Sequence, residues 1–251
     1  SEAEAPPEQK FVLIGDRDFS QDWPRDAEAF EWLGEVFTMD RAPAAGAAHM
    51  GNMRRLGLQS GKVFTPDDRA KAILERAAAT GEAIALSMAF QNRVSKPIYP
   101  GKRQWEPYAN NRSPVFLPEG GYEEVEERAG AWHQLVGNFA TYTPAEPGTG
   151  QFSMGSYKDG DGNLLNGSNL YRFTMPADVP VKQFWQFPVY STTNRSFVQT
   201  DQGIATRSST DEDLIVNDDG SVDIYIGPKK PEGDVNWIKS NPGEGWFPLL
   251  R

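Results

Sequence analysis

The possible folds of this chain are limited chiefly by the residue pattern of 146–251, where short apolar or aromatic runs alternate with tight-turn pairs. The pairs are Asp159-Gly160, Asp161-Gly162, Asn166-Gly167 and Asp219-Gly220. Such pairs tolerate positive φ angles, and they therefore favour tight turns between strands. Many short strands at this spacing are typical of a sandwich or barrel. We expect residues 146–251 to form an antiparallel β-sandwich.

The apolar runs give the expected strands, which are 151–157, 169–175, 183–190, 196–200, 214–216, 221–227 and 246–250. The clearest hairpin joins 214–216 to 221–227, because the sequence Asp218-Asp219-Gly220-Ser221 between them is strongly turn-forming.

Residues 21–145 follow a different residue pattern, which predicts a helical subdomain. The expected fold class is therefore α+β. Apolar residues at helical spacing predict helices over 23–38, 47–56, 65–91 and 121–140. We expect Asp22 to cap the first helix and the Thr65 hydroxyl to cap the third, with Pro66 at its first position. Residues 95–120 should be irregular and partly extended. Residues 1–20 predict a flexible lead-in with a short strand at 11–14 that could complete the sandwich.

Composition excludes several classes of function. The formal net charge is −10, with −6 on residues 1–150 (16 Lys and Arg against 22 Asp and Glu) and −4 on residues 151–251 (9 against 13). Because both halves are acidic, we expect no nucleic-acid partner. The chain has no run of about 18 apolar residues that could span a bilayer, and it has no cysteine. No cofactor-binding motif is present, so we expect no cofactor.

Histidine occurs only at His49 and His133. A metal site built from several histidines is therefore excluded, and a catalytic triad would need one of these two. The acidic turn that begins at Asp159 resembles the start of a Ca²⁺ loop, but position 12 is Leu170 instead of the required Glu. We interpret this segment as a hairpin turn and expect no metal.

Several C-terminal motifs resemble one uncharacterised and mainly bacterial family, the domain of unknown function 1214. The motifs are Leu165–Phe173, Met175–Pro180, Phe184-Trp185, Asn194–Ser196, Asn217–Asp223, Tyr225–Pro228, Asn236–Ile238 and Pro242–Phe247. The resemblance implies a jelly-roll-like sandwich with the helical subdomain packed beside it. Members of the family usually follow a partner domain, the domain of unknown function 1254, and continue beyond the final Trp-Phe strand. We therefore expect a piece or an abbreviated member, whose partner is the N-terminal domain of the same protein.

Arginine and aromatic residues recur at the expected strand ends, and they are the materials of a polar ligand pocket. Guanidinium groups pair with carboxylates or phosphates, and indole faces stack on sugars or cations. In the alternative interpretation, the tryptophans fill the core and the arginines cap strand ends by binding carbonyls or Asp. The candidate ligand-binding residues are Tyr190, Asn194, Arg195, Asp201, Arg207, Trp237, Trp246 and Arg251.

Two functional classes follow. In the first, the chain is a binding or structural module of an exported or envelope protein, periplasmic or secreted, that recognises a carbohydrate or a small anionic ligand. The cytoplasm is the alternative location. In the second, it is part of a hydrolase-like enzyme whose other catalytic groups lie on a missing N-terminal domain. Asp201 with Asp211 or Glu212 is then the candidate carboxylate pair for glycoside hydrolysis. The absence of a usable His, Cys or nucleotide motif favours the first class.

Overall fold

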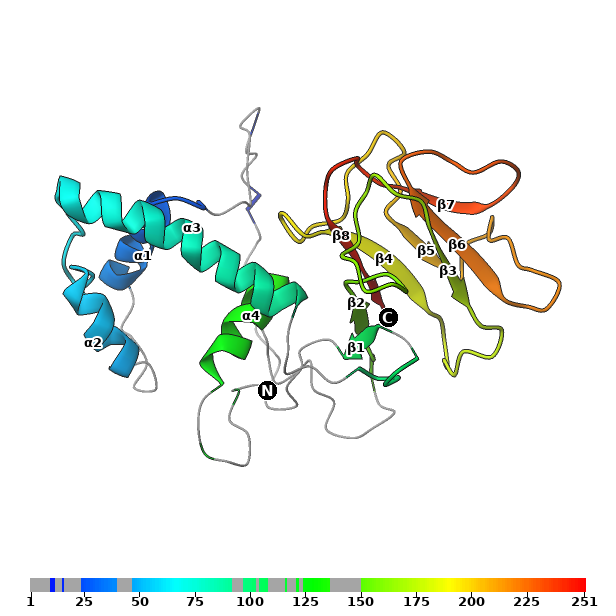
Figure 1. The fold of residues 1–251 in the computed structure, drawn as a ribbon, viewed down its shortest axis with the longest axis horizontal. Helices are drawn as coiled ribbons and strands as arrows, with labels where there is room; N and C mark the ends of the chain where they lie inside the picture. The colour runs from blue at the N-terminus through cyan, green and yellow to red at the C-terminus, as the bar shows by residue number, and fades with distance from the viewer. Residues whose placement is uncertain are drawn as a thin grey trace. The chain divides into compact units, whose positions relative to one another are not determined.

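The structure is a computed structural model that describes residues 10–11, 15, 24–39, 47–91, 97–102, 104–107, 116, 121, 124–135 and 150–251. These residues contain four helices and eight strands in two sheets, which confirms the α+β class (Figure 1). The helices are α1 Glu28–Met39, α2 Ala47–Arg55, α3 Asp68–Phe90 and α4 Val125–Leu135. The expected strand at 11–14 lies largely outside the described residues, and the expected cap Asp22 lies outside them entirely.

Contacts divide the chain into two compact units, Ser1–Glu75 and Arg76–Arg251. The division falls inside α3. The second unit contains both sheets, α4 and the C-terminal part of α3. The subdomain boundaries expected at residues 20 and 145 stay predictions.

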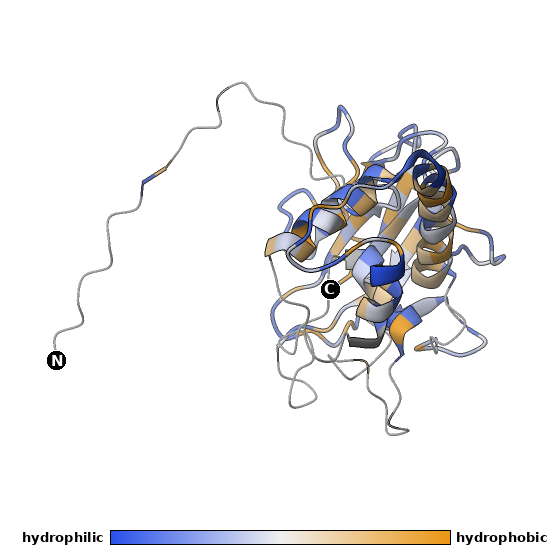
Figure 2. Ribbon diagram, turned by 90° about the vertical axis from the view of Figure 1, so that its left-hand side faces the viewer, coloured by the Kyte–Doolittle hydropathy of each residue, from blue (hydrophilic) through white to orange (hydrophobic). Residues whose placement is uncertain are grey.

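Carboxylates cap the N-termini of α1 and α3. The Asp67 carboxylate accepts the Ala70 amide at 2.7 Å, and the Asp26 carboxylate accepts the Glu28 amide at 3.0 Å. The cap expected at Thr65 is therefore wrong by two residues, because Asp67 is the residue that stands directly before the first helical residue. The helices carry both hydrophobic and hydrophilic residues, as the colours in Figure 2 show.

The larger sheet has five antiparallel strands in the order β1-β2-β8-β4-β5. Their bounds are β1 Trp105–Pro107, β2 Met154–Ser156, β4 Gln186–Ser191, β5 Thr206–Ser208 and β8 Trp246–Leu250. The smaller sheet has the order β3-β6-β7, with β3 Tyr171–Met175, β6 Val222–Gly227 and β7 Asn236–Lys239. β6 and β7 run parallel, so the expectation of purely antiparallel sheets is wrong at this pairing. The jelly-roll topology stays a prediction.

The two sheets share one core, which makes this region a sandwich. Phe173 of the smaller sheet stacks on Phe187 of the larger, with ring centroids 4.8 Å apart and planes 20° apart. Trp105 packs edge-on against both rings, at 5.3 Å from the Phe173 centroid and 6.4 Å from the Phe187 centroid. Around these rings, Ile224 and Ile238 are fully buried. Burial of this apolar surface is the main force that holds the sheets together.

The larger sheet is covered on its other face as well. All five residues of β8 are buried, and alternate residues belong to two different clusters. Trp246 and Leu250 lie in the sandwich core, whereas Phe247 and Leu249 pack against Phe90 of α3. β8 is therefore the central strand of a sheet with two apolar faces, and it reads as a continuous hydrophobic run for this reason.

The expected hairpin between 214–216 and 221–227 is only half correct. The turn is present, since the Asn217 amide donates to the Ser221 carbonyl at 2.8 Å. However, residues 214–216 form no strand, because the Asn236 side chain binds the main chain of Ile215 in place of a neighbouring strand. Similarly, 196–200 forms only an isolated bridge between Phe197 and Tyr190.

Candidate functional site

The best-defined candidate site is the pair Tyr190 and Arg251. Arg251 Nη2 donates a hydrogen bond to the Tyr190 hydroxyl at 2.9 Å. Tyr190 is a buried residue of β4, and Arg251 is exposed directly after β8. Main-chain bonds of 2.9 Å in both directions between Gln186 and Arg251 extend the β4–β8 pairing to this position. Both functional groups therefore project from a well-ordered sheet, on the same face as Phe247 and Leu249.

A row of aromatic rings holds the Tyr190 ring in place. Tyr190 stacks on Phe247 with centroids 5.6 Å apart and planes 21° apart, and Phe197 covers its other side at 4.9 Å. Phe247 in turn contacts Tyr157 at 5.7 Å and Phe90 at 5.2 Å. Because the ring is fixed between two neighbours, the hydroxyl has a defined position relative to the guanidinium.

The environment keeps the Tyr190 phenol protonated. Burial raises its pKa above the ordinary value of 10.0, and the nearby Arg251 charge opposes this shift only in part. The phenol oxygen accepts the hydrogen bond from Arg251, so its own proton is available to a further acceptor. Together the two groups present a guanidinium and a hydroxyl donor to one place.

Arg251 has no acidic partner among the described residues. Its only described side-chain contact is the Tyr190 hydroxyl, and no Asp or Glu side chain of the described part of the chain lies within ion-pair distance. An exposed guanidinium without a carboxylate retains most of its donors for solvent or for an anionic ligand.

Asn194 and Arg195 belong to the tight turn after β4. The Asn194 side-chain oxygen accepts the Ser196 amide at 3.1 Å, and Arg195 adopts a φ of 58°, in the left-handed region. Arg195 is buried, and its Nη1 donates to the Thr193 carbonyl at 2.5 Å. This guanidinium stabilises its own loop, as the alternative interpretation of the arginines expects.

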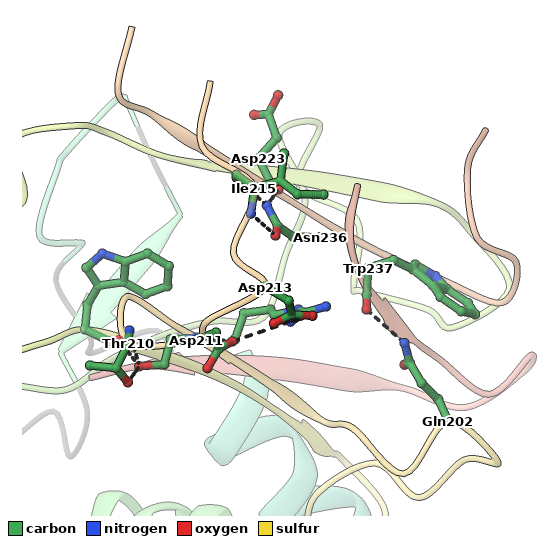
Figure 3. A network of polar contacts seen from close by, with 11 residues as sticks. Gln202, Thr210, Asp211, Asp213, Ile215, Asp223, Asn236 and Trp237 are labelled. Atoms are coloured by element: carbon green, nitrogen blue, oxygen red, sulfur yellow. Dashed lines mark hydrogen bonds and ion pairs between the residues drawn. The ribbon is translucent and has the colours of Figure 1, made fainter. Parts of the chain in front are cut away.

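Asp201 and Trp237 each take part in contacts at the edge of β7. Asp201 forms an ion pair with Lys239, and this bond lowers the pKa of its carboxyl group. The neighbouring Gln202 donates to the Trp237 carbonyl at 3.0 Å and accepts the Lys239 amide at 2.7 Å. The side chains of loop 201–202 thus act as an extra pairing partner for β7 (Figure 3).

Arg207 is a structural arginine of β5. Its side chain is 11% exposed, and Nη1 lies 2.9 and 3.0 Å from the two carboxylate oxygens of Asp213 and 3.6 Å from Asp211. Asp211 also accepts the Ser208 amide at 3.0 Å. These bonds fold the loop that follows β5 back onto the strand, as drawn in Figure 3.

Trp246 lies in the sandwich core, where it is 3% exposed and meets the edge of the Tyr171 ring at 5.4 Å. The eight candidate residues therefore fall into separate groups. Their described contacts join Tyr190 to Arg251, and join Asp201 to Trp237 through Gln202 and Lys239. No described contact links these groups to one another or to Arg207. Whether any of the eight binds a ligand stays a prediction.

Sequence reasoning missed a buried polar group beside the aromatic row. Gln134 of α4 donates from Nε2 to the Ala89 carbonyl at 3.2 Å and also to the Tyr157 hydroxyl. His133 is 6% exposed and meets the edge of Phe90 at 6.4 Å, so it packs in the interior. Gly155 lies beneath this group, since a Cβ there would stand 2.6 Å from the Tyr157 hydroxyl oxygen. No pattern in the sequence links these distant positions.

The turn at Asp159 behaves as a hairpin turn. Its carboxylate accepts the amides of Asp161 at 3.0 Å and Asn163 at 2.9 Å, and the Asn163 amide bond chiefly lowers its pKa. Among the described residues, no three His, Cys, Asp or Glu side chains are grouped closely enough to bind a metal ion. Within the same part of the chain, no helix has the length and apolar character to cross a bilayer.

The fold and this distribution of polar groups define a two-sheet sandwich module with a helix-covered face. Residues 150–251 match the model of the family described as protein of unknown function (DUF1214). The match confirms the family resemblance of the C-terminal module. A preceding domain of unknown function 1254 stays a prediction.

Two solved structures show a weaker similarity. A crystal structure of a protein from Vibrio parahaemolyticus has a TM-score of 0.38 and 16% identity, covering 94% of this chain and 54% of that one. A crystal structure of an uncharacterised protein from Burkholderia cenocepacia has a TM-score of 0.33 and 16% identity, covering 86% and 46%. The chain thus spans about half the length of these two structures. No curated protein matches it.

Proposed function

We propose that the C-terminal module is a binding module of an exported or envelope protein that recognises a carbohydrate or a small anionic ligand. The observation that supports this proposal is the exposed Arg251 guanidinium, which Tyr190 positions at 2.9 Å and which has no carboxylate partner among the described residues. Such a guanidinium favours a carboxylate, a phosphate or the acidic group of a sugar.

The chemistry of the pair suits recognition rather than turnover. Arg251 supplies a permanent positive charge, and the Tyr190 hydroxyl supplies a second donor whose proton is retained at neutral pH. A ligand oxygen between them would receive hydrogen bonds from both groups. Neither group is a nucleophile or a general base in these protonation states.

The hydrolase alternative has less support among the described residues. Asp201 is engaged in an ion pair with Lys239, and Asp211 accepts the Ser208 amide and lies near Arg207. Both carboxylates are therefore held by structural partners. An enzyme that used this pair would have to release both carboxylates from these partners.

A thermal-shift screen tests the proposal. The panel should contain neutral sugars, sugar acids, succinate, citrate and inorganic phosphate, applied to the wild type and to Arg251→Gln. A ligand at one hundred times its dissociation constant stabilises by about 2.7 kcal/mol. For a unit of this size the melting temperature should rise by about 5–11 °C.

We expect this shift to disappear in Arg251→Gln and to weaken in Tyr190→Phe, which removes the hydroxyl but keeps the ring. Lys230→Gln is the matched control, because it removes one exposed positive charge from the 228–235 connection. If no compound stabilises the wild type, or if Arg251→Gln and Lys230→Gln respond alike, the proposed site is incorrect.

A further inference from the structure

The smaller sheet places a cation and two aromatic rings in one row across its three strands. In the register of β3 and β6, Arg172 is opposite Tyr225. In the register of β6 and β7, Tyr225 is opposite Trp237. Residues opposite one another in a sheet project from the same face. Arg172, Tyr225 and Trp237 therefore form a continuous cross-strand row, called here the outer row.

The outer row lies on the face that points away from the sandwich core. Its strand neighbours Ile224 and Ile226 are 0% and 1% exposed and belong to the core, so the alternate residues point to solvent. Tyr225 and Trp237 are half-buried, and Arg172 is exposed. Figure 1 shows β7 at the edge of this sheet, beside β6.

A hydrogen bond fixes the orientation of the Trp237 ring. Its indole Nε1 donates to the Gly227 carbonyl at 3.0 Å on the neighbouring strand. A Cβ at Gly227 would stand 2.7 Å from Leu170 Cδ1 and 3.1 Å from Leu170 Cα, so Leu170 packs closely over this position. Because the only polar atom of the indole is engaged with the backbone, the ring offers its apolar surface to a ligand.

Polar side chains border the outer row on both sides. On one side, the Thr174 hydroxyl donates to the Asp223 carboxylate at 2.5 Å. On the other, Lys239 forms its ion pair with Asp201. Arg172 makes no side-chain hydrogen bond or ion pair with any described residue, so its donors are available at one end of the row.

We propose that the outer row binds a short saccharide chain. The apolar C–H faces of pyranose rings would cover the rings of Tyr225 and Trp237, and sugar hydroxyls would meet Arg172 and the bordering polar groups. Neighbouring strands are about 4.8 Å apart, so the row spans about 10 Å, roughly the length of a disaccharide. An aromatic centre with a few fixed polar groups at its border is the usual composition of a small-ligand site.

Charge selects the saccharide over the other ligand that stacks on aromatic rings. Bases of single-stranded nucleic acid stack in the same way, but they bring a phosphate with each base. The region 151–251 has 9 Lys and Arg against 13 Asp and Glu, a net charge of −4. Such a surface repels a polyanion. A saccharide that is neutral along most of its length therefore fits the outer row best.

This inference deepens the proposed function and rests on it in one respect, the assumption that the module binds a polar ligand. It uses residues other than Tyr190 and Arg251. The two proposals can therefore fail separately, because Arg251→Gln should leave saccharide binding unchanged.

Calorimetric titration of the whole chain tests the inference, with the hexasaccharides of β-1,4-glucose, β-1,4-N-acetylglucosamine and α-1,4-glucose as probes. We expect at least one probe to bind, and its dissociation constant to rise at least tenfold in Trp237→Ala and in Tyr225→Thr. Arg172→Gln should raise it by a few fold. Phe152→Ala is the matched control, since Phe152 is an aromatic residue that is 62% exposed and lies outside the row.

Tyr225→Thr decides the outcome if Trp237→Ala fails to fold, because threonine favours strands and replaces an outward-facing ring. Loss of binding in Tyr225→Thr, with unfolding curves like those of the wild type, supports the saccharide site. The inference is overturned if none of the three probes binds, if Tyr225→Thr binds as tightly as the wild type, or if Phe152→Ala weakens binding as much. Tight binding of an oligonucleotide in place of the sugars would overturn it as well.

Discussion

We predict that hydrogen bonds from the Asn236 side chain contribute most to holding the segment 214–216 in place. Asn236 is 2% exposed, and its carboxamide makes three hydrogen bonds with the main chain. Its oxygen accepts the Ile215 amide at 2.9 Å, and its nitrogen donates to the carbonyls of Ile215 at 2.8 Å and Asp223 at 2.9 Å. Figure 3 shows these bonds joining the segment to β6 and β7.

The expected loss of unfolding free energy follows from the number of hydrogen bonds that the substitution removes. Each hydrogen bond contributes about 1 kcal/mol net. Ile215 is partly exposed, so water can replace some of what its main chain loses. We therefore expect Asn236→Ala to lower the free energy of unfolding by about 2–3 kcal/mol. For a unit of this size the melting temperature should fall by about 4–12 °C.

Urea unfolding followed by tryptophan fluorescence measures this change as a shift of the midpoint at constant slope. Asn236→Asp is the more selective variant, because it keeps the acceptor for the Ile215 amide but loses both donors. It should destabilise at neutral pH and recover part of the loss when the carboxyl group is protonated. The control Asn217→Ala removes a single, partly buried hydrogen bond to the Ser221 hydroxyl. If Asn236→Ala is no more destabilising than Asn217→Ala, the assignment is wrong.

Two further predictions concern a close approach and a titrating group. Gly167→Ala should lower the free energy of unfolding by about 1–3 kcal/mol or more, since its Cβ would overlap the main-chain oxygen of Asn241. Gly160→Ala, which has no atom within 4 Å of its added Cβ, should be nearly neutral in the same urea titration. For Tyr190, burial raises the pKa of the phenol in the folded state above 10.0. The protonated phenol therefore contributes its full stabilisation of the folded state below pH 10, and this contribution is lost as the pH rises further. Melting temperatures between pH 8 and 11 should therefore fall more steeply for the wild type than for Tyr190→Phe; parallel curves would contradict this.

Local patterns predicted the elements that depend on local chemistry. All four helices lie at the expected positions, and β2, β3, β4, β6 and β8 lie at or near expected strands. β7 was missed although Asn236 and Ile238 point inward and Trp237 and Lys239 point outward, an alternation that is visible in the sequence. β5 was missed because Thr206–Ser208 has too few apolar residues to give a pattern.

Sequence patterns did not predict which distant strands pair with one another. The parallel pairing of β6 and β7 creates the row from Arg172 to Trp237, and no spacing in the chain indicates that register. The candidate list included Trp237 but neither Arg172 nor Tyr225 for this reason. Conversely, Arg195 and Arg207 were selected by residue type, whereas each binds a partner within a few residues of itself. Residue type alone does not distinguish a loop-stabilising arginine from one that faces a ligand.

The position of β8 has a consequence for how the module can be assembled. The strand that joins β2 to β4 comprises residues 246–250, so during synthesis its two neighbours are made long before it. Until these residues leave the ribosome, β2 and β4 keep open edges that can pair with other chains. We expect a ribosome-bound chain that ends before Trp246 to be protease-sensitive and to require a chaperone, because closure of the larger sheet depends on β8.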